Sequence, residues 1–228
     1  IKDYLRPMAG VVANTPRICR AIRSQGYFNA FPDSFGGIRR FPLMVTYRDK
    51  IFPSMGLETF SQELGFDPVP ARDNDGSLTG ISVGSRFIPT NRLGEMLINY
   101  RGGEDLFPIY SAIDILEGRV GPKELAGKTV LVGATAVGIY DLRVTPVSPN
   151  LPGVIAQANL LDNLYRGDFL LENTWTRLVS LGAMVLMTCF LSFFLPRVQI
   201  LLGLGATTLL IGSYGYLVQG LFRQGILL

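Results

Sequence analysis

The side chains that carry most enzyme chemistry are scarce in this chain of 228 residues. It contains no histidine and only two cysteines, Cys19 and Cys189. Without histidine, this chain cannot hold a Ser-His-Asp or Cys-His nucleophile system or any histidine metal site. Two cysteines are too few for a disulfide framework or a four-cysteine zinc site. We therefore expect no catalytic residue, no metal site and no cofactor in this segment.

Three short motifs have simple structural explanations. Residues 80–84 (GISVG) match the G-x-S-x-G nucleophile elbow, but the context is strand-like and no histidine base is available. Residues 133–138 (GATAVG) lack the Lys-Ser/Thr ending of a P-loop, so we interpret them as a tight turn whose amides could still hold an anion. Asp73, Asp75 and Gly76 resemble the start of a calcium loop without its final glutamate, which favours a solvated turn.

Better binding candidates follow the β-branched run 128–134 (KTVLVGA), which predicts a buried strand. An α/β sheet usually binds ligands beyond the carboxyl ends of its strands. This places Thr135, Asp141, Arg143 and Thr145 at a candidate ligand site. Asp141 and Arg143 could offer a charge and a bidentate fork to a polar ligand. The somewhat favoured alternative is that they pair with each other or cap loop amides, and so hold the following loop against the sheet.

The elements that must position these residues alternate between strand and helix signals over residues 1–173. Strands are expected over 41–47, with 51–52 as partner, then over 81–89 and 94–100 as a hairpin or meander, and over 128–134. Helices are expected over 15–25, 57–65, 109–116 and 154–165, and a loop over 67–76. This alternation predicts an α/β domain.

The end of the chain has a different composition. All 18 acidic residues precede residue 173, and the only later charges are Arg177, Arg197 and Arg223. Between these arginines lie two uncharged apolar runs, 178–195 and 198–222, and a helix that crosses a bilayer needs about 20 such residues. Neither run has a polar face, which disfavours two buried helices of a soluble protein.

We therefore predict a domain over 1–173 that lies outside the membrane. It is followed by membrane helices over 174–196 and 198–222, which form an antiparallel hairpin, and by the start of a further membrane helix at 224–228. Because the chain begins with Ile1 and shows no signal peptide, we expect a fragment of a longer protein. Arg197 in the short turn favours a cytoplasmic turn and an extracytoplasmic domain, although the other two arginines favour the reverse.

The net charge of +3 does not indicate nucleic acid. Residues 1–173 hold 18 basic residues (21 minus the three late arginines) and 18 acidic residues, so this part is neutral. The excess belongs to the arginines that border the apolar runs. We expect membrane lipid, and no nucleic acid, among the partners.

Residues 127–170 resemble the end of the second type of CHASE domain, the cyclase/histidine-kinase-associated sensory extracellular domain. The matching pieces are LVGATA (131–136), DLR (141–143), Thr145-Pro146, PGV (152–154), Ala158-Asn159 and Asp162-Asn163. Residues 26–45, 98–102 and 107–120 are also similar to that family. Two positions depart from it: Phe35 replaces a usual aspartate, and Gln157 replaces the histidine of many members, which adds Gln157 to the candidate ligand site.

The resemblance implies an α/β sensor domain followed by transmembrane α-helices, in a receptor of the bacterial inner (plasma) membrane. The sensor would face outward, bind an unknown ligand or protein, and act as a homodimer. The cytoplasmic output would be a class III adenylate or guanylate cyclase, so the parent protein is expected to be an adenylate cyclase. Alternative output domains are a histidine kinase, a diguanylate cyclase or a protein kinase. Alternative roles for this segment are a dimerisation module without ligand and an extracytoplasmic enzyme tethered to the membrane, although the missing catalytic residues disfavour the enzyme.

Overall fold

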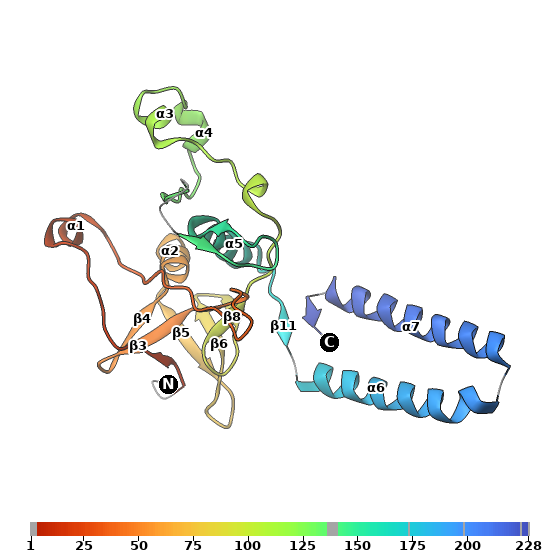
Figure 1. The fold of residues 1–228 in the computed structure, drawn as a ribbon. Helices are drawn as coiled ribbons and strands as arrows, with labels where there is room; N and C mark the ends of the chain where they lie inside the picture. Colours follow the sequence, from red (N-terminus) through yellow and green to blue (C-terminus); the bar gives the residue numbers. More distant parts are fainter. Residues whose placement is uncertain (1–3, 136–140, 173, 198, 224, 228) are drawn as a thin grey trace. The chain divides into compact units, whose positions relative to one another are not determined.

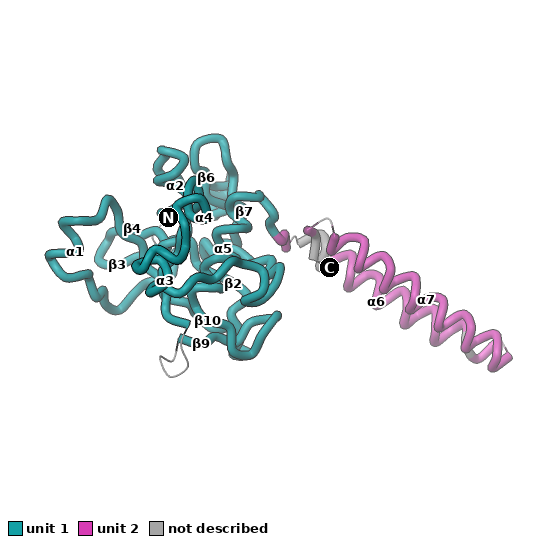
Figure 2. The backbone as a smooth tube through the Cα atoms, turned by 90° about the horizontal axis from the view of Figure 1, so that it is seen from above, with its two compact units in different colours: residues 1–169 teal, residues 170–228 magenta. Residues whose placement is uncertain are grey.

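The chain forms two compact units, residues 1–169 and 170–228 (Figure 2). Small sheets of short strands make up much of the first unit. The computed structural model describes residues 4–135, 141–172, 174–197, 199–223 and 225–227. The strands of the first unit are β1 (Arg6–Pro7), β2 (Arg40–Pro42), β3 (Met44–Tyr47), β4 (Lys50–Pro53), β5 (Pro68–Arg72), β6 (Leu78–Val83), β7 (Arg86–Pro89), β8 (Glu95–Leu97), β9 (Leu142–Arg143) and β10 (Leu151–Pro152). Its helices are α1 (Pro16–Ala21), α2 (Met55–Leu64), α3 (Ala112–Leu116), α4 (Pro122–Leu125), α5 (Gly153–Arg166) and the 3-10 helix η1 (Glu104–Leu106).

The sheets are mixed in connectivity but mainly antiparallel. One has the order β1-β3-β4, with β1 parallel to β3, and another is the antiparallel meander β5-β6-β7. β2 pairs with β8 and β9 with β10, both antiparallel. Strands and helices share one hydrophobic core, so the predicted α/β class is confirmed.

Helices α2 and α5 have the clearest local signals and pack on each other (Figure 1). The Ser54 hydroxyl accepts a hydrogen bond from the Leu57 amide at the start of α2. Gly65 and Gly167 end the two helices with positive φ angles of 74° and 69°, which glycine adopts most readily. A Cβ on Gly56 would lie 2.7 Å from Leu160 Cδ2, so this glycine permits the close helix contact.

The predicted strand over 41–47 is two strands with different partners. β2 pairs with β8, whereas β3 pairs with β1 and, through a tight turn, with β4 as expected. Arg48 and Asp49 in that turn both have positive φ, as a two-residue hairpin turn of type I′ requires. The predicted strand over 81–89 is two strands, β6 and β7, which form a hairpin with each other. The expected pairing of 81–89 with 94–100 is wrong, because β8 pairs with β2 instead.

Two further predictions in the first unit are wrong. The expected loop over 67–76 contains β5. Pro68 and Pro70 lack an N–H donor, but because they are two residues apart, both missing donors lie on the same edge of the strand. The other edge keeps its donors and pairs with β6. The expected buried strand over 128–134 is not a strand, and Val132 is 91% exposed. A strand forms only against a partner, and no strand of the described residues pairs with this segment.

The second unit holds the two apolar helices, α6 (Thr174–Phe194) and α7 (Ile200–Phe222). They run antiparallel and side by side, joined through the 3-10 turn η2 (Leu195–Arg197) (Figures 1 and 2). Within the described residues, α7 is long and apolar enough to cross a membrane, and α6 contains a shorter apolar stretch, Leu178–Phe194.

The segment predicted to begin a further membrane helix lies at the end of this unit. Residues 224 and 228 of that range lie outside the described residues. Ile226–Leu227 form a short strand, β12, which pairs in parallel with β11 (Leu171–Glu172).

Candidate ligand-binding site

The β9–β10 hairpin leads directly into α5 and places the Asp141 carboxylate beside the first turn of that helix. The Asp141 carbonyl accepts a hydrogen bond of 2.8 Å from the Gly153 amide. A Cβ on Gly153 would collide with the Asp141 carboxylate oxygens, so only glycine fits there without a shift. The Pro152-Gly153 pair therefore brings the carboxylate and the helix start into close contact.

The electrostatics of this contact are favourable. α5 begins without a side-chain cap and has no acidic residue in its first turn, so no side chain of the helix itself compensates the partial positive charge of its first amides. The Asp141 carboxylate lies beside them, and Arg143 Nη2 donates a hydrogen bond of 2.8 Å to Asp141 Oδ1. The pairing of Asp141 with Arg143, favoured from the sequence, is thus present in the structure, with both side chains 38% exposed.

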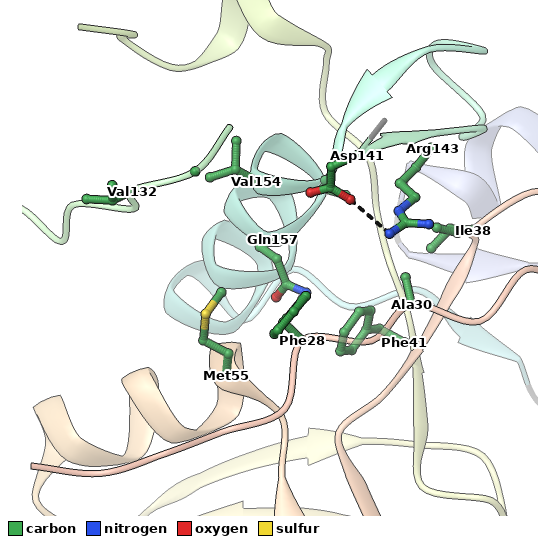
Figure 3. A pocket seen from close by; sticks show the side chains of 13 residues that line it. Phe28, Ala30, Ile38, Phe41, Met55, Val132, Asp141, Arg143, Val154 and Gln157 are labelled. Carbon is green, nitrogen blue, oxygen red and sulfur yellow. Dashed lines mark hydrogen bonds and ion pairs between the residues drawn. The ribbon is translucent and has the colours of Figure 1, made fainter. Parts of the chain in front are cut away.

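A cavity of about 260 Å³ opens beside this ion pair (Figure 3). Most of its wall is apolar, and the polar side chains on it are Asp141, Arg143 and Gln157. The other lining residues are Phe28, Ala30, Ile38, Phe41, Met55, Val132, Gly133, Gly153, Val154 and Ala156.

Gln157 is the buried polar residue of the cavity. Its side chain extends from α5 toward Met55 and Phe28 (Figure 3), and the residue is only 6% exposed. Its Oε1 is fully buried and has no hydrogen-bond partner among the described residues. A buried polar atom without a partner costs about 1–3 kcal/mol. A ligand or water that donates to this oxygen would remove that cost.

The structure brings three of the five predicted site residues together. Asp141, Arg143 and Gln157 line the cavity, whereas Thr145 and Thr135 do not. Thr145 is buried and closes a turn, because its hydroxyl lies 3.0 Å from the Ser148 carbonyl and 3.2 Å from the Ser148 amide. Thr135 is exposed. Residues 136–138 of the predicted turn lie outside the described residues.

The apolar wall of the cavity was missed in the sequence because it comes from distant segments. Tyr27 exchanges backbone hydrogen bonds with the segment before α2: its amide donates to the Pro53 carbonyl and its carbonyl accepts from the Met55 amide. These bonds place Phe28 beside Met55 at the cavity. A Cβ on Gly26 would lie 2.6 Å from the Met55 backbone, so this glycine permits the approach.

The two departures from the family pattern fall in different environments. Phe35 is 81% exposed and does not line the cavity. The neighbouring Asp33 carboxylate is engaged locally: it accepts from the Phe35 and Gly37 amides and pairs with Arg39 at 3.0 Å. Gln157, in contrast, lies in the cavity. Of the two changes, the one at Gln157 therefore alters the lining of the cavity.

The asparagines of α5 form a second cluster, on the side of the helix that faces residues 99–102. Asn163 accepts from the Asn99 amide at 2.8 Å and donates to the Asn99 carbonyl at 3.0 Å. Asn159, one turn earlier, accepts from the Arg101 amide at 3.2 Å and donates to the Gly102 carbonyl at 3.3 Å. Both asparagines are completely buried, and they bind this backbone as a neighbouring strand would.

Charged groups continue this attachment. Arg101 Nη1 lies 3.1 Å from Asp162 Oδ2, and the Asn99 side-chain amide donates to Asp168 Oδ2 at 3.1 Å. The segments 98–102 and 158–163, recognised separately in the sequence, are therefore direct partners. Their role is to fix α5.

The comparisons with known proteins identify one family. The model of the CHASE2 domain matches residues 3–195, which is most of the chain. The comparisons with curated proteins and with solved structures gave no match.

Proposed function

Because the chain belongs to the CHASE2 domain family, the extracellular sensory domains of signalling receptors, we propose that it is the sensory and membrane region of a bacterial transmembrane receptor. The observation that carries this proposal is the extent of the family match, which runs from the first unit through α6. The cavity beside α5 supplies a place where such a domain would receive a small molecule.

The second unit supports anchoring in the inner membrane. Both helices are apolar, and the charged residues of 173–228 are the three arginines at their ends. In our proposal α6 and α7 cross the bilayer as a hairpin, with Arg197 on the cytoplasmic side and residues 1–173 outside.

The two native cysteines test this topology. Cys19 lies in α1, and Cys189 lies within α6. In spheroplasts that express the chain, a membrane-impermeant maleimide should label Cys19 and leave Cys189 unlabelled. Cys19→Ser is the matched control, because it removes the outer thiol and should abolish labelling.

The cytoplasmic turn is tested by Gln199→Cys in the Cys19→Ser background. This thiol should react only after the membrane is permeabilised. Labelling of Gln199→Cys in intact spheroplasts would overturn the proposed orientation.

We further propose that the receptor controls a class III adenylate or guanylate cyclase. The resemblance to sensory domains of cyclases supports this output, with a histidine kinase or diguanylate cyclase as the alternative. Cells that express the complete receptor should accumulate cyclic AMP or cyclic GMP. Cyclic di-GMP, or phosphate transfer from ATP to a histidine, would instead establish the alternative output.

Signal transmission is proposed to pass through α5. The first turn of this helix lines the cavity, and the helix ends at Gly167, shortly before the chain enters α6. A bound molecule would displace or rotate α5, in a homodimer, and so act on the membrane helices.

A further inference from the structure

We propose that the cavity beside α5 binds a small neutral molecule that has an aromatic or cyclic apolar body and one hydrogen-bond donor. This inference rests on the proposed sensory function and names the chemical class of its ligand. Four features support it: the apolar lining of the cavity, the Gln157 oxygen without a hydrogen-bond partner among the described residues, the ion pair of Asp141 with Arg143, and the size of the cavity.

The wall favours an apolar ring. Phe41 and Ile38 are almost completely buried, whereas Phe28 and Val132 are 68% and 91% exposed. A ring that enters the cavity would contact the aromatic side chains and Met55, which make favourable contacts with aromatic ligands. It would also remove the exposed apolar surface of Phe28 and Val132 from water.

The polar requirement is a donor. Gln157 Oε1 is buried without a hydrogen-bond partner among the described residues. An amide oxygen accepts hydrogen bonds and cannot donate them. A ligand N–H or O–H that reaches Gln157 would therefore supply the hydrogen bond that this buried oxygen lacks.

The charges of the cavity favour a neutral molecule. The Asp141 carboxylate lies against the first turn of α5 and pairs with Arg143 at 2.8 Å. Each charge already has a partner of opposite sign, so the pair presents no net charge that would attract a charged ligand. A neutral ligand leaves it intact.

The size of the cavity limits the ligand to one or two rings. A volume of about 260 Å³ exceeds the roughly 150 Å³ of an engineered apolar cavity that binds benzene. A pair of fused rings fits this space, while most of a nucleotide or a peptide would lie outside it.

Indole and indene provide a matched pair of probes, because they share a fused-ring shape and only indole carries an N–H donor. Binding is measured by isothermal titration calorimetry with the full chain in nanodiscs. We expect indole to bind at least tenfold more tightly than indene, since one hydrogen bond to a buried acceptor contributes on the order of a factor of ten.

Two variants assign the binding to this cavity. Gln157→Leu removes the acceptor at similar volume and should reduce indole affinity about tenfold without weakening indene. Gln62→Leu is the control, because Gln62 is an exposed glutamine on α2 that donates to Glu58. Ala30→Phe places a ring inside the cavity and should abolish the binding of both probes.

Three results would overturn the inference: equal affinity for indole and indene, no binding of indole, or indole binding that Gln157→Leu leaves unchanged. Heat that persists in Ala30→Phe would show partition into lipid and would also count against the site. These outcomes are separate from the sensory function, because the cysteine labelling and the cyclic-nucleotide assay can succeed when indole fails.

Discussion

At the scale of single residues, several positions that resemble the family hold α5 in place. Asn159 and Asn163 satisfy four backbone groups of residues 99–102, and Gly153 accommodates the Asp141 carboxylate. Each of these roles depends on one residue type, because an amide is both donor and acceptor and only glycine lacks a Cβ. The signature thus first specifies how α5 is held, and two of its charged residues also reach the cavity.

Asn163→Ala should lower the free energy of unfolding by roughly 2–4 kcal/mol, because it leaves the Asn99 amide and carbonyl buried without partners. Urea denaturation of the full chain in detergent, followed by fluorescence, measures the change. Asn74→Ala is the control at an exposed turn residue and should change stability by less than about 0.5 kcal/mol. Equal effects of the two variants would contradict the role assigned to Asn163.

Gly153→Ala should destabilise the chain by about 1–3 kcal/mol, since the new methyl group occupies the space of the Asp141 carboxylate. Gly10→Ala is the matched control, because a Cβ on Gly10 meets nothing within 4 Å. In the Asp141→Ala background the cost of Gly153→Ala should shrink markedly. A cost that is the same in both backgrounds would show that the carboxylate is not the obstacle.

At the scale of elements, α5 connects three parts of the molecule. Its first turn lines the cavity, its asparagines attach it to residues 99–102, and its end at Gly167 precedes the link to α6. A buried helix with fixed contacts moves as a unit, so a displacement at its first turn reaches its last. The proposed transmission would therefore depend on the short link between α5 and α6.

Insertion of four glycines between Gly167 and Thr174 should uncouple the sensor from its output. A flexible linker absorbs a displacement of α5 before it reaches α6. In cells that express the complete receptor, basal cyclic-nucleotide synthesis should persist while its response to stimulus disappears. A four-glycine insertion after Gly10, in an exposed segment, is the control. An unchanged response after the first insertion would refute transmission through this link.

At the scale of the whole molecule, two half-buried tyrosines, Tyr27 and Tyr100, pack against the main hydrophobic core of the first unit. Burial, followed by the nearby Glu95 carboxylate, raises the pKa of Tyr27 far above its usual value. Burial alone raises the pKa of Tyr100 in the same direction. Both phenols are thus held neutral in the folded chain and ionise more easily when it unfolds.

The fold should consequently lose stability in alkali. A raised folded-state pKa contributes stability that is fully present below the unfolded value of about 10 and is lost as the pH rises above it. Absorbance at 295 nm should show two tyrosines that ionise only as the chain unfolds, and urea midpoints should fall above about pH 10. Tyr27→Phe should weaken this dependence, and an unchanged alkaline decline in that variant would exclude Tyr27 as a cause.

The sequence by itself determined the parts of this protein that depend on neighbouring residues. Glycines at positions 65 and 167 marked the ends of α2 and α5, alternating signals predicted the α/β class, and uninterrupted apolar runs predicted the two C-terminal helices. These signals are carried by residues that are close together in the sequence, so they can be recognised without knowledge of the tertiary structure.

Only the tertiary structure decided what depends on partners from far along the chain. Residues 68–72, expected to lie in a loop, became the strand β5 because β6 pairs with them. The more strand-like run 128–134 has no partner strand among the described residues. The same holds for the site residues predicted from the sequence. Asp141, Arg143 and Gln157 line the cavity, whereas Thr135 and Thr145 do not. The cavity also needed Phe28 and Met55, which only the backbone hydrogen bonds of Tyr27 bring to α5. A strand needs a partner strand, and a cavity needs the side chains that line it. Both come from distant parts of the sequence, and only folding brings them together.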